Sequence, residues 1–146
     1  MKYTVKDRFL KYVKIDTTAD PYSNTSPSTE KQKDLTKVLM EELAEMGIKS
    51  ETNSSGYVYA RIPSNVDHDT KTVFFCSHID TAYDCSGTDV KPIVHTDYQG
   101  QDIVLPDDTT QVITPDKYPA LNGKTGHDII TASGLTLLGS DDKSGL

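Results

Sequence analysis

The chain has 146 residues, enough for one domain with a buried core or for part of a larger domain. Its 22 acidic and 15 basic side chains give a formal net charge of -7, and the basic residues form no stripe, which argues against nucleic acid or an anionic membrane surface as partner. The sequence shows neither a signal peptide nor a membrane span, and Cys76 and Cys85 lack CxxC spacing, so we expect a cytoplasmic protein with reduced, packed thiols.

Two amphipathic helices are predicted near the N-terminus. Residues 3–14 place apolar side chains at close to the 3.6-residue helical period. After a polar loop, Ser26 has the character of an N-cap and Pro27 that of a first-turn proline. The apolar positions that follow, between 35 and 46, lie on one face of a helix that should end at Gly47.

Strand patterns follow the second helix. Residues 48–53 and 57–63, joined by a Ser-Ser-Gly turn, predict a hairpin. The stretch KTVFFCSHID, residues 71–80, contains a continuous apolar run typical of a strand buried on both faces.

The second half of the chain begins with a long polar segment. Residues 84–128 contain several prolines and few apolar pieces, which indicates an irregular excursion. Residues 128–139 then predict two short strands around a Ser-Gly turn. The whole order favours an α/β fold with a mixed, largely buried sheet and helices on its faces.

His78 and Asp80 leave the carboxyl end of the predicted central strand, where functional crevices of open α/β sheets lie. In extended backbone the two side chains point to the same side. Such a pair can be a metal ligand with an orienting carboxylate, a general base with its partner, or a surface hydrogen bond.

Asp141 and Asp142 form a second acidic position, in the turn GSDDKSG. Two adjacent carboxylates at a tight turn repel each other, so they form either a solvated tail or a cation site. If both acidic positions open at one edge of the sheet, imidazole and carboxylates together suit a divalent metal such as zinc, and one carboxylate can bridge two ions. Lys143, beside them, is either a surface ion-pair partner or a functional group.

SHIDTAYD followed by LLGSDDKSG resembles the paired metal motifs of the di-zinc exopeptidases, a family that includes carboxypeptidase G and the aminoacylases. TSPSTEKQKDLTKVLMEELAEMG and GHDIITASGLTLLGSDDKSG point to the tripeptidase T branch of that family. The resemblance implies that His78 binds zinc, that Asp141 bridges two zinc ions, and that Asp80 contributes to catalysis by orienting His78. It also implies a cis peptide between Asp141 and Asp142.

The same resemblance implies an aminopeptidase that releases the N-terminal residue of a tripeptide by attack of metal-activated water, with a homodimer as the full-length assembly. In this family the general base and the remaining ligands lie beyond the GxDDK motif. We therefore expect residues 1–146 to be the N-terminal portion of the catalytic domain, without the lid domain and inactive alone. The alternative is a noncatalytic, stand-alone domain with weak binding of a metal or a protein partner.

Overall fold

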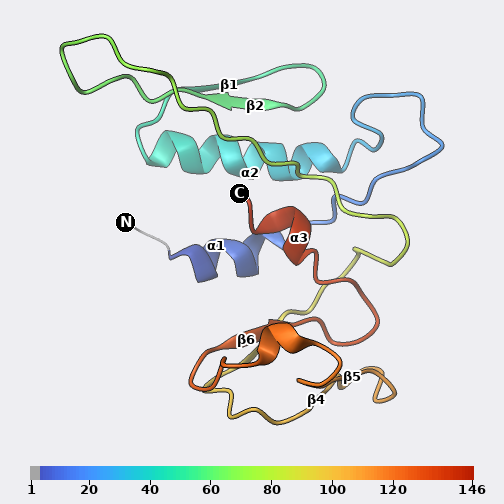
Figure 1. Cartoon of the computed structure of the whole chain (residues 1–146). Coiled ribbons are helices and arrows are strands. Elements are labelled where there is room, and N and C mark those ends of the chain that lie inside the picture. The colour runs from blue at the N-terminus through green and yellow to red at the C-terminus, as the bar shows by residue number, and fades with distance from the viewer. Residues whose placement is uncertain (1–3) are drawn as a thin grey trace. The chain divides into compact units, whose positions relative to one another are not determined.

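The computed structural model describes residues 4–146 and contains both helices and strands (Figure 1). The elements are α1 (Val5–Tyr12), α2 (Gln32–Glu45), β1 (Ser50–Thr52), β2 (Val58–Ala60), β3 (Ile93–His95), β4 (Ile103–Val104), β5 (Val112–Ile113), the 3-10 helix η1 (Pro119–Leu121), β6 (Ile129–Thr131) and α3 (Ser140–Lys143). The predicted α/β class is confirmed. The chain divides into two compact units, unit 1 with Met1–Asp16 and Asp84–Ser140, and unit 2 with Thr17–Tyr83 and Asp141–Leu146.

Helix α1 of unit 1 begins with a capping box. The Thr4 hydroxyl accepts a hydrogen bond from the Asp7 amide at 3.1 Å, and the Asp7 carboxylate accepts one from the Thr4 amide at 2.9 Å. These bonds satisfy backbone N–H groups that have no partner within the helix. The predicted helix is confirmed over 5–12, while residue 3, where the prediction begins, lies outside the described residues.

The remainder of unit 1 is built from two antiparallel strand pairs. Strand β3 pairs with β6, with Val94 opposite Ile130, and β4 pairs with β5. Tyr98, Ile103 and Leu105 form a buried core beside these pairs. The polar excursion is therefore more ordered than predicted, because a few apolar residues suffice to bury a small core between short strands.

The predicted hairpin over residues 128–139 is wrong. Its first strand exists as β6, but this strand pairs with β3, and residues 135–138 form no strand. Gly134 occupies the intended turn with φ of +121°, a conformation that favours glycine. The first strand is thus correctly placed and its partner is not.

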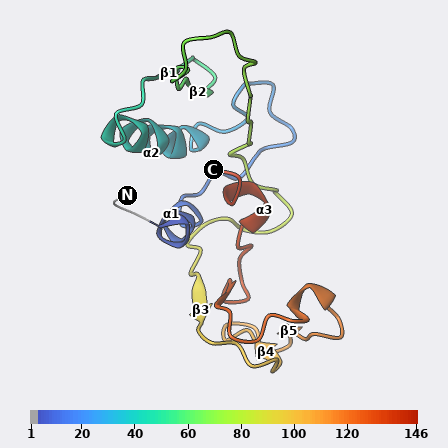
Figure 2. The same cartoon turned by 60° about the vertical axis from the view of Figure 1, so that its left-hand side comes forward.

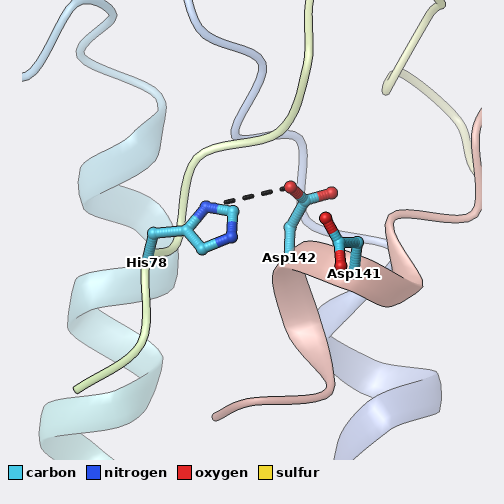
Figure 3. A group of neighbouring side chains, drawn as sticks. All are labelled: His78, Asp141 and Asp142. Carbon is cyan, nitrogen blue, oxygen red and sulfur yellow. Dashed lines mark ion pairs between the residues drawn. The ribbon is translucent and has the colours of Figure 1, made fainter.

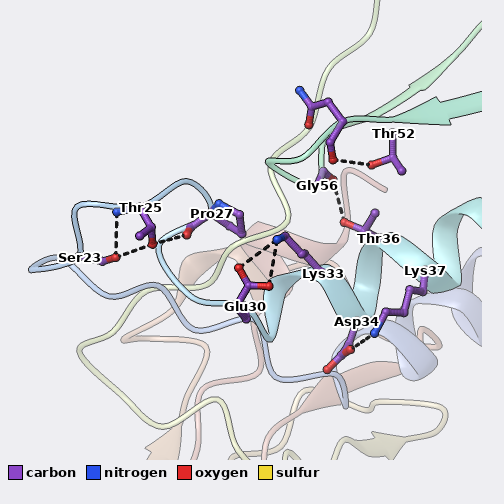
Figure 4. Close-up of polar contacts among 11 residues, drawn as sticks. Ser23, Thr25, Pro27, Glu30, Lys33, Asp34, Thr36, Lys37, Thr52 and Gly56 are labelled. Carbon is purple, nitrogen blue, oxygen red and sulfur yellow. Dashed lines mark hydrogen bonds and ion pairs between the residues drawn. The ribbon is translucent and has the colours of Figure 1, made fainter.

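In unit 2 the second predicted helix is confirmed as α2, but it begins at Gln32 rather than near Ser26. Ser and Thr side chains in residues 23–29 hydrogen-bond to nearby backbone groups, as when the Thr25 hydroxyl donates to the Pro27 carbonyl at 2.8 Å (Figure 4). Such local bonds compete with helical ones, so the helix starts only after this loop.

Among the described residues, no helix combines the length and the apolar character that crossing a bilayer requires.

The predicted hairpin after α2 is confirmed as β1 and β2, which pair in antiparallel register with Glu51 opposite Tyr59. The hairpin lies beside α2 in both cartoon views (Figures 1 and 2). Buried Thr36 of α2 donates its hydroxyl to the Gly56 carbonyl in the hairpin turn at 2.7 Å (Figure 4). Helix and hairpin are thereby held together by a buried polar contact as well as by packing.

The central buried strand predicted within residues 71–80 is wrong. The described strands form three separate two-stranded sheets in place of one larger sheet, and none of them pairs with residues 71–78. Phe74 and Phe75 are 80% and 88% exposed. An extended segment becomes a sheet strand only where a neighbour satisfies its N–H and C=O groups, and in the described residues none does so here.

Candidate metal centre

The segment that carries His78 is held by backbone bonds to the start of unit 2. The Thr81 amide donates to the Thr17 carbonyl at 3.1 Å, and the Ala19 amide donates to the Thr81 carbonyl at 2.9 Å. The Thr17 hydroxyl also donates to the Ile79 carbonyl at 2.6 Å. Although residues 77–80 form no strand, these bonds fix the backbone on the C-terminal side of His78.

His78 and Asp80 point to the same side, as their spacing predicts. The His78 Nδ1 atom lies 3.3 Å from the Asp80 carboxylate and 3.1 Å from the Asp80 carbonyl oxygen. Either oxygen can accept a hydrogen bond from a protonated Nδ1, and in that tautomer the Nε2 lone pair is available to another group. About half of each side chain is exposed.

Asp141 and Asp142 lie on α3, a single helical turn directly after Gly139. Gly139 has φ of +70°, which turns the chain sharply before the helix. The peptide between the aspartates is not cis, so the implied cis bond is absent here, because the two residues belong to one helical turn and helical backbone uses trans peptides. The acidic pair therefore lies in a short helix, in which Asp141 is exposed and Asp142 is partly buried.

His78 meets both aspartates in unit 2 (Figure 3). One possible ligand atom from each of His78, Asp141 and Asp142 lies within 4.8 Å of the other two. The closest ion pair among them joins His78 Nδ1 to Asp142 Oδ1 at 3.8 Å, and the Asp142 side chain is 13% exposed. That distance is too long for a hydrogen bond, so Asp80 is the closer hydrogen-bond acceptor for Nδ1.

The donor set suits zinc chemically. One imidazole and two carboxylates match the nitrogen and oxygen ligands of zinc, and atoms bound to one tetrahedral ion lie roughly 3.4 Å apart. The three groups are spaced within 4.8 Å of one another, so a small closing movement brings them to such a distance. The fit identifies this cluster as a candidate metal site.

The structure brings together all three predicted site residues, His78, Asp80 and Asp141. It adds two features that the sequence analysis did not assign. Asp142 is a further candidate ligand, because its Oδ1 atom lies 3.8 Å from His78 Nδ1. Lys143 is buried, at 2% exposure, rather than on the surface. Adjacency to Asp141 could have suggested Asp142 as a ligand, whereas nothing in the local sequence signals the burial of Lys143.

The prediction for the two cysteines is confirmed only in part. Cys76 and Cys85 are free thiols, as expected, but both are exposed rather than packed, since their segments lie at the surface. His95, which lies in polar sequence, belongs to β3 and its Nε2 atom lies 3.0 Å from the Thr131 hydroxyl of β6. Neither cysteine nor His95 belongs to the cluster around His78.

Comparison with known proteins gives the chain close relatives, although no protein-family model matches it. Peptidase T of an Exiguobacterium species is 46% identical over 147 residues, which cover 100% of this chain and 36% of that protein. Peptidase T of Geobacillus thermodenitrificans is 44% identical over the same extent. Peptidase T of Halothermothrix orenii is 46% identical over 143 residues, or 97% of this chain and 35% of that protein.

These relatives confirm the resemblance predicted from the motifs. The similarity extends along the whole chain, including the segments that carry His78 and the two aspartates. The chain spans little more than a third of the length of the curated relatives it matches, 36% in the first two.

Proposed function

We propose that this chain, which belongs to the peptidase T family, is the N-terminal portion of the catalytic domain of a zinc-dependent aminopeptidase that releases the N-terminal residue from tripeptides. One observation carries the proposal. His78 and the Asp141–Asp142 pair, from segments far apart in the sequence, converge within 4.8 Å in a chain that is similar over its whole length to proteins named Peptidase T.

In this proposal His78 and Asp141 hold the metal, with Asp142 as a further candidate ligand. The Asp80 carboxylate accepts a hydrogen bond from Nδ1–H of His78, which leaves the Nε2 lone pair free to bind an ion and fixes the orientation of the ring. Asp141 has two carboxylate oxygens and can therefore serve two ions at once. Bound zinc supplies an activated water and a polarised scissile carbonyl.

The three groups do not complete a two-ion centre. Each zinc ion normally takes three or four ligands from the protein. Among the described residues, the cluster offers only His78, Asp141 and Asp142, too few ligands for two ions. In this proposal the remaining ligands and the general base lie in residues that correspond to the part of the relatives that this chain does not span. Residues 1–146 on their own should bind zinc weakly and should not turn over a tripeptide.

The test uses the full-length product of the gene that encodes this chain. Hydrolysis of an unblocked tripeptide, followed by chromatography, should need zinc, stop with a chelator and fail with the N-acetylated peptide. His78→Ala and Asp141→Asn should abolish both turnover and tight zinc binding. His68→Ala, at an exposed histidine outside the cluster, should change neither. Turnover that survives His78→Ala and chelation would refute the proposal.

A second candidate function is a noncatalytic domain that binds a metal weakly or a protein partner. The exposed apolar run at residues 73–75 favours it, because exposed apolar patches mark protein contact sites. A full-length product that hydrolyses no peptide yet retains a bound protein through this run would support the second function. Phe74→Ser combined with Phe75→Ser should then release that protein, since both side chains are exposed and their loss leaves the buried residues in place.

A cytoplasmic location and a homodimer of the full-length protein belong to the first proposal. Both rest on the resemblance to the peptidase family. Cell fractionation tests the location, and light scattering of the full-length product tests the dimer. A monomer would remove the dimer from the proposal and leave the chemistry at His78 unaffected.

A further inference from the structure

Lys143 buries a cationic side chain directly beside the acidic pair. The residue is 2% exposed, among the most buried side chains described. Its Nζ atom donates a hydrogen bond to the Ile79 carbonyl at 3.0 Å and another to the Thr17 hydroxyl. Burying an ammonium group is costly unless polar partners replace water, and these two oxygens are among the groups that do so.

The partners of Lys143 lie on the segment that carries the other metal candidate. Ile79 stands between His78 and Asp80, and its carbonyl accepts hydrogen bonds from both Lys143 and Thr17. Thr17 itself is fully buried, so its hydroxyl is held in place by packing as well as by these bonds. Lys143 Nζ, the Thr17 hydroxyl and the Ile79 carbonyl form a closed triangle, called the Lys143 clamp below.

The clamp joins two segments whose spacing determines the candidate metal centre. Lys143 follows Asp142 on α3, and Ile79 follows His78, so a bond between Lys143 and Ile79 restrains the separation of the imidazole from the carboxylates. A second contact brings the same segments together, since a side chain at Gly145 would overlap Ser77. Two contacts, one from Lys143 of α3 and one from Gly145 just after it, therefore dock residues 143–145 against residues 77–79.

We propose that Lys143 is a positioning residue, whose buried ammonium keeps His78 and the Asp141–Asp142 pair close enough together for a metal ion to bind. The inference rests on the proposed function, because it assigns Lys143 a purpose at that site. It differs from a role in substrate binding, since the ammonium is directed to Thr17 and Ile79 within the protein. It predicts that loss of the clamp weakens metal binding even though no ligand is removed.

The experiment measures zinc affinity of the full-length gene product by competition with a chelating dye, and the visible spectrum of its cobalt form. Lys143→Met keeps the length of the side chain and removes its charge, and Thr17→Val keeps the shape of threonine and removes its hydroxyl. Each should weaken zinc binding by about 10-fold to 100-fold, the usual effect of losing a group that orients ligands. Each should also shift the cobalt spectrum, because the ligands are held differently.

Two controls separate positioning from general stability. Thr17→Ser restores the hydroxyl and should restore affinity, and Lys37→Met removes an exposed lysine of α2 and should leave affinity unchanged. The thermal midpoint of the metal-free variants reports stability separately. If Lys143→Met fails to fold, Thr17→Val decides the question, because it leaves the lysine in place.

The outcomes distinguish the two proposals. The clamp is merely structural if the folded variants keep the zinc affinity and the cobalt spectrum and only their thermal midpoint falls. That result would overturn this inference alone. Unchanged metal binding by the full-length His78→Ala variant would overturn the proposed site, and the role of Lys143 with it.

Discussion

Replacing Gly145 by alanine tests how closely the residues just after α3 approach the segment that carries His78. A Cβ atom at position 145 would lie 3.2 Å from the Ser77 Cβ and would overlap the Ser77 hydroxyl oxygen. The hydroxyl can rotate away about χ1, but the Ser77 Cβ is fixed to the backbone. The two backbones must therefore separate by some tenths of an ångström.

The magnitude follows from this crowding. A contact of 3.2 Å is shorter than the 3.4 to 4 Å of ordinary van der Waals contact, and overpacking a close contact costs about 1 to 3 kcal/mol. If the docked arrangement is the one that binds metal, the same free energy weakens zinc binding. Since 1.4 kcal/mol is tenfold, we expect affinity to fall by roughly 5-fold to 150-fold.

The assay is the zinc competition titration on the full-length gene product, with two further variants. Ser144→Ala adds no atoms at an exposed neighbouring position and should have no effect. Ser77→Gly removes both atoms that the new methyl group meets, so the double variant Gly145→Ala with Ser77→Gly should recover much of the lost affinity. Gly145→Ala with unchanged affinity, or a double variant no better than the single one, would show that this approach does not control the metal site.

Three further predictions concern the stability of the units, each measured by urea denaturation. In unit 1 the Lys6 ammonium donates a hydrogen bond to the Asp128 carboxylate at 2.6 Å. This hydrogen bond is the main reason that the pKa of Asp128 lies below its usual value. A carboxyl group whose pKa is lowered in the folded state stabilises the fold above about pH 4, and this stabilisation is lost as the pH falls through the folded-state pKa. The Lys6→Met variant lacks this contribution, so it should lose less stability than the unmodified chain between about pH 5 and pH 2. Equal losses would contradict the proposed effect of Lys6 on Asp128. Gly134→Ala should destabilise unit 1 by about 2 to 5 kcal/mol, because φ is +121° and the new Cβ would meet the Asp108 amide nitrogen at 2.9 Å; a neutral effect would rule out this backbone geometry. Leu35→Ala should destabilise unit 2 by about 2 to 5 kcal/mol, since Leu35 is 0% exposed, and a cost below that range would mean that the site collapses around the smaller residue.

Sequence patterns of short range were reliable in this chain. The periodic apolar residues of 5–12 and 32–45 form α1 and α2, and the Ser-Ser-Gly turn connects the strands of a real hairpin. These features depend on residues within one or two turns of each other, so the local sequence contains most of what determines them. The start of α2 was misplaced because side-chain bonds in the preceding loop satisfy the backbone in another way.

Patterns that need a distant partner were predicted less well. The apolar run around Phe74 and Phe75 has the composition of a buried strand, yet it lies exposed because no described segment pairs with it. Strand β6 was recognised as a strand, but its partner proved to be β3 and not the residues just after it. Strand composition identifies a segment that can pair, and long-range contacts choose the partner.

The candidate site shows the same division. The sequence alone identified His78, Asp80 and Asp141 through their motifs, and the spacing of His78 and Asp80 predicts that their side chains share one side. Only the tertiary structure brings Asp142 to His78 and buries Lys143 against Thr17 and Ile79. The physical reason is that a lysine ammonium is stable either in water or where buried oxygen atoms accept its hydrogen bonds, and Thr17 and Ile79 come within reach of Lys143 only once segments distant in the chain have folded together.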